Sequence, residues 1–156
     1  MTHHAEIRGG LPVAAFDSLP ETEQIVVRTL RHWAEGPNGA VQIAGLLRAR
    51  MPEGAAIDCH RLLGDVFGVI ARHGRRKLVR HHARCPCVGA DEAVLAHFVT
   101  LAATGEREDA MLVGSLMVAG AVLLPFTEAA RQAGLHLRRA VLAGPPAPPG
   151  AAQRLH

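Results

Sequence analysis

The sequence has few aromatic side chains and few cysteines. Among its 156 residues there is no tyrosine, and only four phenylalanines and one tryptophan. Proteins that bind single-stranded nucleic acid regardless of sequence stack the bases on aromatic side chains, so this class is disfavoured. The three cysteines cannot form a complete disulfide framework, which argues against a small secreted disulfide-rich protein.

Several sequence motifs of known enzymes are also missing. The chain has no GxxxxGK[ST] phosphate loop, no GxGxxG fingerprint and no HExxH zinc-protease motif. The zinc deaminase pattern begins at His4-Ala5-Glu6 and again at Pro86-Cys87, but Ala90 stands where that pattern needs its second cysteine. The sequence therefore gives no positive signal for these enzyme classes.

No targeting or membrane segment is recognised. The N-terminal residues MTHHAEIRGG include Glu6 and lack the apolar core of a secretory signal. The longest uncharged run, residues 110–126, contains two glycines and Pro125, and is better explained as a buried helix than as a membrane span. We expect a cytoplasmic protein with no membrane span, whose thiols stay reduced.

Hydrophobic periodicity predicts an all-α fold, a compact single-domain bundle of five to six helices with short connections. The clearest stripe comprises Cys59, Leu62, Leu63, Val66, Phe67 and Ile70. Residues 106–119 are apolar on all sides after three initial acids, which predicts a central helix. We expect an irregular arm at 1–17, a helical domain at 18–143 and a proline-rich tail at 144–156. The expected helices cover residues 20–35, 38–51, 58–73, 90–105, 106–119 and 125–142.

Positive charge is concentrated in one segment. Residues 66–90 contain six arginines and lysines and no acid, whereas the rest of the chain has eleven basic and fourteen acidic residues. Such a segment either binds an anionic partner or stabilises negative charge within the protein. The candidate anion-binding side chains are Arg75, Arg76, Lys77 and Arg80.

The same segment contains four potential metal ligands within seven residues: His81, His82, Cys85 and Cys87. Thiolates and imidazoles are the ligands that zinc prefers, and a loop allows neighbouring ligands to converge. We predict a zinc-type site at 75–90 built from His82, Cys85 and Cys87, with Cys59 as the fourth ligand. Three cysteines exclude a four-cysteine site or a four-thiolate iron–sulfur cluster within one chain.

The sequence does not decide which residue is the fourth ligand. Cys59 lies on an apolar helix face, where a cysteine usually acts as a small buried hydrophobic residue. The alternatives to Cys59 are His60, His73, His81, His97 and Asp91.

Three other functions compete with a structural or regulatory metal site. Cys85 and Cys87 could form a thiol redox pair. A three-ligand metal with Glu92 as general base could hydrolyse a substrate. A basic DNA-binding regulator could use helices 38–51 and 58–73, but about ten residues separate their apolar parts, which is long for a helix-turn-helix, and Asp65 would meet phosphates.

These observations favour a small, non-catalytic, metal-binding accessory or regulatory protein. A protein partner is expected, and nucleic acid is the less favoured partner.

Overall fold

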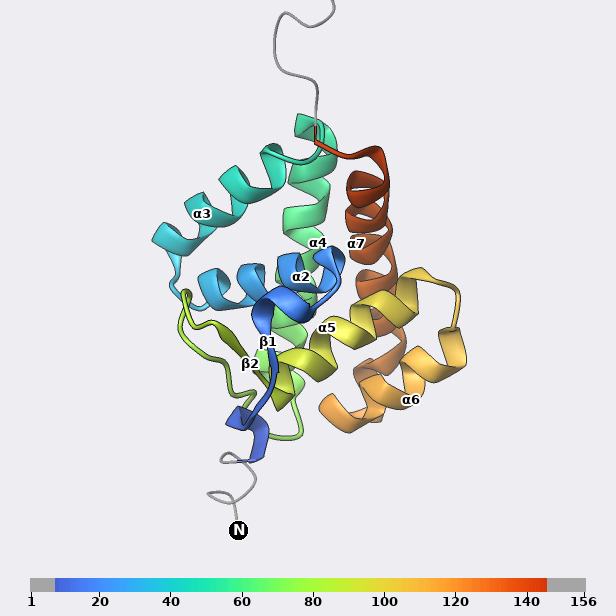
Figure 1. The fold of residues 1–156 in the computed structure, drawn as a ribbon. Coiled ribbons are helices and arrows are strands. Elements are labelled where there is room, and N and C mark those ends of the chain that lie inside the picture. Colours follow the sequence, from blue (N-terminus) through green and yellow to red (C-terminus); the bar gives the residue numbers. More distant parts are fainter. Residues whose placement is uncertain (1–7, 146–156) are drawn as a thin grey trace, which may run out of the picture.

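The computed structural model describes residues 8–145 and consists mainly of helices, labelled here as in Figure 1. The predicted all-α fold is confirmed, and each predicted helix is present. Two short 3-10 turns, η1 (Phe16–Ser18) and η2 (Gly120–Val122), lie between longer elements. The helices are α2 (Glu21–Trp33), α3 (Pro37–Arg48), α4 (Glu53–His73), α5 (Ala90–Ala103), α6 (Arg107–Met117) and α7 (Leu123–Ala143).

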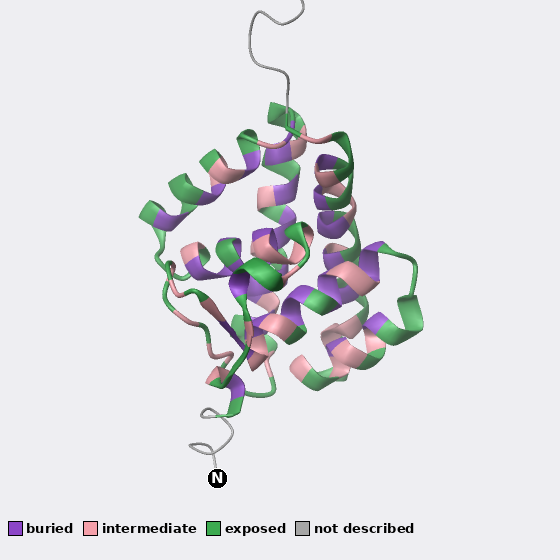
Figure 2. Ribbon diagram, in the orientation of Figure 1, coloured by how far each residue is buried: buried purple, intermediate pink, exposed green. Residues whose placement is uncertain are grey.

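The core lies where α5 and α4 pack against α7, and α5 also contacts α2 and α6 (Figure 2). Gly134 of α7 allows α5 to come close, because a Cβ at this position would lie 2.7 Å from the carbonyl oxygen of Val99 and 2.7 Å from Cβ of Ala103. Phe98 and Phe126 stack between these helices with their ring centroids 4.6 Å apart. Close packing therefore explains a glycine that lowers helix propensity.

Helix α6 is not the central helix that its composition suggests. Only Ala110 and Gly114 are buried in it, while Leu112 and Leu116 are 69% and 71% exposed. The helix lies at one side of the bundle, and α5 occupies the centre (Figure 1). An apolar composition does not determine which faces of a helix pack against other elements. In α6, only the face with Ala110 and Gly114 is buried.

Helix α4 begins about one turn earlier than predicted. It starts at Glu53 directly after Pro52, so Asp58, where the predicted helix begins, already lies within the helix. The connection from α3 is therefore only residues 49–52, a length that helix-turn-helix pairs commonly have. The predicted stripe from Cys59 to Ile70 is buried as expected.

A small antiparallel sheet replaces part of the predicted irregular arm. Strand β1 (Pro12–Ala15) pairs with β2 (Cys87–Gly89), and Ala15 lies opposite Cys87. The pairing continues where the Phe16 amide donates to the Pro86 carbonyl at 2.7 Å. Strand β2 lies within the segment 75–90 that the sequence predicts as a loop, and its partner comes from the predicted irregular arm. The sheet holds the cysteine loop against the bundle.

Residues 1–7 and 146–156 lie outside the described part of the chain. The predicted proline-rich tail therefore falls almost entirely outside it. Helix α7 ends at Gly144, which has a φ of 71° that favours glycine.

Candidate metal centre

The loop between α4 and β2 brings three metal-ligating side chains together. The side chains of His81, Cys85 and Cys87 place one ligand atom each within 4.8 Å of the other two. Nδ1 of His81 lies 3.4 Å from Sγ of Cys85 and 3.8 Å from Sγ of Cys87, and the two sulfur atoms are 3.1 Å apart. All three residues are partly exposed, so this ligand group lies at the protein surface.

Two of the four predicted ligands, Cys85 and Cys87, belong to this group, and His81 takes the place expected for His82. The His82 side chain is exposed, and its Nδ1 accepts a hydrogen bond from the Arg84 amide at 3.3 Å. The His82 carbonyl also accepts from the Cys85 amide, which closes a turn. This turn separates neighbouring side chains, so adjacent histidines do not share the site.

Cys59 is the predicted ligand that the structure places elsewhere. It is fully buried in α4, and its Sγ lies 3.9 Å from the Ala133 carbonyl of α7. Burial raises the pKa of the Cys59 thiol to about 12, because a thiolate would be desolvated there. Helix packing thus directs this side chain into the core and not toward the 81–87 loop.

Two of the alternatives named for the fourth ligand have other partners. Asp91 pairs with Arg76, and His97 lies 3.7 Å from Glu23 while its side chain is more than half exposed. Neither belongs to the group formed by His81, Cys85 and Cys87.

The imidazole of His81 is oriented with Nδ1 toward the sulfur atoms. Its Nε2 lies 2.8 Å from the Gly10 carbonyl oxygen, which can only accept a hydrogen bond. Nε2 is therefore the donor, and in the neutral ring the lone pair is on Nδ1, facing both cysteines. Metal-ligating histidines are commonly fixed in this manner by a carbonyl or carboxylate at the opposite nitrogen.

The loop is held from beneath by a buried ion pair between Arg31 of α2 and Glu92 of α5. The two side chains are almost inaccessible to solvent, and Nε of Arg31 lies 2.7 Å from Oε1 of Glu92. A second contact joins Nη2 to Oε2 at 2.9 Å. The two residues are 61 positions apart in the chain, so the pair also fixes α2 relative to α5.

This ion pair also binds the backbone of every residue in the ligand group. Arg31 donates to the carbonyls of Cys85 and Cys87 at 2.9 and 2.8 Å. Glu92 accepts from the amide of His81 at 3.0 Å and from that of Gly89 at 3.0 Å. The positions of all three ligand residues therefore depend on one pair of charges that is buried beneath them.

The sequence did not identify Arg31, and it assigned Glu92 only as a helix-start acid or as a general base. Both carboxylate oxygens of Glu92 accept two hydrogen bonds within the protein. Glu92 is consequently engaged in the scaffold and is not placed to activate a water molecule. Arg31 lies among the apolar residues of its helix, which is the one hint in the sequence that it is buried. That pattern does not show that Glu92 is its partner.

Electrostatics favour a thiolate at Cys85. The hydrogen bond from the Cys87 thiol, with further contributions from His81, lowers the pKa of Cys85 to about 7. The same hydrogen bond raises the pKa of Cys87, which keeps the proton. The hydrogen bond to the Gly10 carbonyl raises the pKa of His81, and the Cys85 sulfur adds to this effect. One sulfur thus bears negative charge easily, as a metal-binding thiolate must.

The predicted anion-binding residues are only partly available to an external ligand. Arg76 forms a bidentate ion pair with Asp91, and Asp91 also accepts from the Val79 amide at 2.8 Å. Arg75 donates to the Ser115 carbonyl at 2.6 Å. Lys77 and Arg80 are exposed side chains of the same loop. Part of the basic segment therefore joins the loop to α5 and α6.

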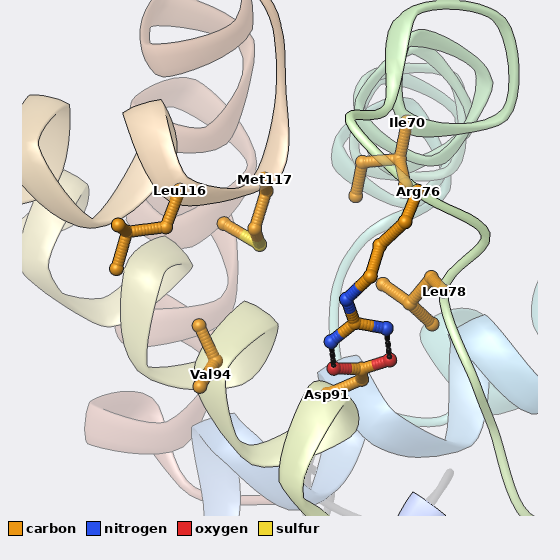
Figure 3. Close-up of a pocket in the computed structure, with 7 residues that line it drawn as sticks. All are labelled: Ile70, Arg76, Leu78, Asp91, Val94, Leu116 and Met117. Atoms are coloured by element: carbon orange, nitrogen blue, oxygen red, sulfur yellow. Dashed lines mark hydrogen bonds and ion pairs between the residues drawn. The ribbon is translucent and has the colours of Figure 1, made fainter. Parts of the chain in front are cut away.

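The Arg76–Asp91 pair borders a small apolar pocket of about 220 Å³ between α4, α5 and α6 (Figure 3). None of the residues that line the pocket belongs to the ligand group. Its apolar lining residues are Ile70, Leu78, Val94, Leu116 and Met117.

Comparisons of the chain with models of known families, with curated protein sequences and with solved structures find no match. Among residues 8–145, no helix has the length and apolar character needed to cross a bilayer. The interpretation of the site therefore depends on its own geometry.

Proposed function

We propose that this protein binds a divalent, zinc-type metal ion through Nδ1 of His81 and the Sγ atoms of Cys85 and Cys87. The observation that carries the proposal is the set of distances among these atoms. For tetrahedral zinc, bond lengths of about 2.3 Å to sulfur and 2.0–2.1 Å to nitrogen give ligand–ligand separations of roughly 3.8 Å between two sulfurs and 3.6 Å between sulfur and nitrogen.

The distances in the site are close to these values. The two sulfur–nitrogen separations of 3.4 and 3.8 Å bracket the tetrahedral one. The sulfur atoms, now 3.1 Å apart, need to separate by well under 1 Å. Small rotations of the two side chains provide this change. The backbone need not move, and Arg31 holds both cysteine carbonyls in place.

Three protein ligands leave the fourth position of a tetrahedral ion for water or for a side chain of another protein. A groove of about 710 Å³ opens beside Cys85 and is bordered by the basic side chains Arg28, His32 and Arg84. Because Glu92 is engaged in the scaffold, we favour an accessory or regulatory role in the cytoplasm, with a protein partner, over hydrolysis.

The experiment is metal analysis of reduced, untagged protein purified without chelator. We expect about one zinc per chain, with two sulfur and one nitrogen scatterers from the protein in X-ray absorption. Acid should release the metal, since protons compete for both thiolates and the imidazole.

The matched variants are Cys85→Ser and Cys59→Ser. Cys85→Ser should lose the metal, whereas Cys59→Ser should keep it, because only Cys85 belongs to the ligand group. Reduced protein that neither takes up zinc nor gains stability from it would contradict the proposal.

A further inference from the structure

The two cysteines of the site are in contact with each other. Their sulfur atoms are 3.1 Å apart, both are free thiols and both are partly exposed. One residue, Pro86, separates them, and its fixed φ restricts the backbone between the two cysteines. Arg31 holds the carbonyls on both sides of that proline. The pair is therefore already positioned for a sulfur–sulfur bond, which needs a separation of about 2.05 Å.

We propose that Cys85 and Cys87 are also a redox couple, and that their oxidation to a disulfide by a hydroperoxide releases the metal ion. This inference rests on the proposed function, since it assigns a regulation to the same site. A metal ion and a disulfide need the same sulfur lone pairs, so the two states exclude each other. Oxidation leaves His81 as the one remaining protein ligand of the three.

The chemistry balances with hydrogen peroxide as the oxidant. The Cys85 thiolate attacks one peroxide oxygen, the O–O bond breaks, and the products are Cys85 sulfenic acid and hydroxide. The Cys87 sulfur then attacks the Cys85 sulfur, the S–O bond breaks and a second hydroxide leaves. In the metal-bound state both sulfurs are thiolates. Together they lose two electrons, and two protons from solution convert the hydroxides to water.

The geometry also predicts that the disulfide is reversible. A bridge between cysteines separated by one residue closes a small ring, and strained disulfides are more easily reduced than relaxed ones. Both residues are partly exposed, which admits a reducing thiol. Cys59 is fully buried in the core and cannot exchange with the pair without unfolding.

The test starts from reduced, zinc-loaded full-length protein treated with hydrogen peroxide. A chromogenic chelator measures released zinc, and mass spectrometry follows the peptide that begins after Arg84 and contains both cysteines. We expect one zinc released for every two thiols lost, with a peptide mass lower by two hydrogen atoms. Dithiothreitol and added zinc should restore the loaded protein.

Two variants give the controls. Cys59→Ser should behave as the unmodified protein, because the couple does not include Cys59. In Cys87→Ser, peroxide should leave Cys85 at the sulfenic acid or a higher oxidation state, with no intrachain disulfide. A disulfide between Cys59 and Cys85 would overturn the assignment.

The two proposals fail in different ways. If reduced protein takes up no zinc, the metal proposal fails, and with it the metal-release step. If zinc binds but peroxide leaves it bound, the redox inference fails while the metal site stands. The redox inference also fails if release accompanies only oxygen addition, with no disulfide and no recovery in dithiothreitol.

Discussion

Two regions of this molecule place cysteine in opposite environments. In the helical core, where α4 packs against α7, Cys59 is fully buried among apolar side chains and its pKa is raised to about 12. In the loop at 75–90, Cys85 and Cys87 are partly exposed, and the pKa of Cys85 is lowered to about 7. The same residue type is inert packing in one region and, in the other, a thiol whose exposure and pKa suit metal binding or nucleophilic attack.

The two regions are also stabilised by different interactions. The core depends on many apolar side chains and on close approach at small residues such as Gly134. The ligand group is held by the buried ion pair Arg31–Glu92, which hydrogen-bonds to the backbone of all three ligand residues, and by the pairing of β2 with β1. Truncating one core side chain leaves many other apolar neighbours packed together. Within residues 8–145, Arg31–Glu92 is the one side-chain pair that hydrogen-bonds to the backbone of all three ligand residues.

The largest effect is expected when that pair is broken. Glu92→Gln removes one charge and leaves the Arg31 guanidinium buried without a counter-charge, which should lower the free energy of unfolding by about 3–5 kcal/mol. Urea denaturation at constant pH measures this change. A decrease of less than about 1 kcal/mol would show that the pair does not hold the loop.

A double variant separates stability from positioning. Arg31→Met with Glu92→Leu fills the same space with apolar atoms, and such replacements can restore stability. Zinc affinity should still fall by about 10–100-fold, because the carbonyls of Cys85 and Cys87 lose their donors. Competition with a chelator measures that affinity. Recovery of affinity along with stability would contradict a positioning role.

The core could be predicted from the sequence because its signal is local. The stripe from Cys59 to Ile70 follows helical spacing, and every residue of it is buried. The positions of the helices along the chain are also a local signal, since glycines and prolines mark where helices begin and end. Exposure of α6 could not be predicted, because periodicity does not show which face of a helix finds a neighbour.

The site was predicted only in part, because its geometry depends on distant residues. Local density of His and Cys identified the loop and two of the three side chains that the structure brings together there. His81 and not His82 faces the two cysteines because its ring binds the Gly10 carbonyl, 71 positions away in the chain. The backbone of the loop is held by Arg31, which lies in helix α2. Strand β1 was missed because a four-residue strand gives too short a pattern to recognise.

The next prediction compares one cysteine from each region. Cys87→Ala should lower zinc affinity by more than about 100-fold, because it removes a ligand and not only a supporting hydrogen bond. Cys59→Ala should keep full zinc occupancy and cost about 1 kcal/mol of stability through the small cavity it leaves. Zinc titration and denaturation of both variants test this pair of outcomes. Loss of zinc from a well-folded Cys59→Ala protein would restore Cys59 as a ligand.

A smaller effect is expected when two neighbouring histidines are compared. His81→Ala should weaken zinc binding by at least about 10-fold, whereas His82→Ala should change it by less than a factor of about three. The difference follows from orientation, since His81 faces the sulfur atoms and His82 is exposed. The same chelator competition measures both variants. Equal effects would mean that the loop rearranges when metal binds, so that both imidazoles approach the ion.

The smallest effect concerns the second ion pair of the loop, Arg76–Asp91. It is bidentate like the buried pair, but Arg76 is substantially exposed and solvent screens its charge. Arg76→Ala should therefore cost no more than about 1 kcal/mol, and Lys77→Ala, the exposed neighbour, should cost almost nothing. Asp91 hydrogen-bonds to the Val79 amide and to no ligand residue, so zinc affinity should stay unchanged in both variants. Urea denaturation and zinc titration of the two proteins measure these differences. If Arg76→Ala destabilised the protein as strongly as Glu92→Gln, the loop would depend on both ion pairs and not on the buried one alone.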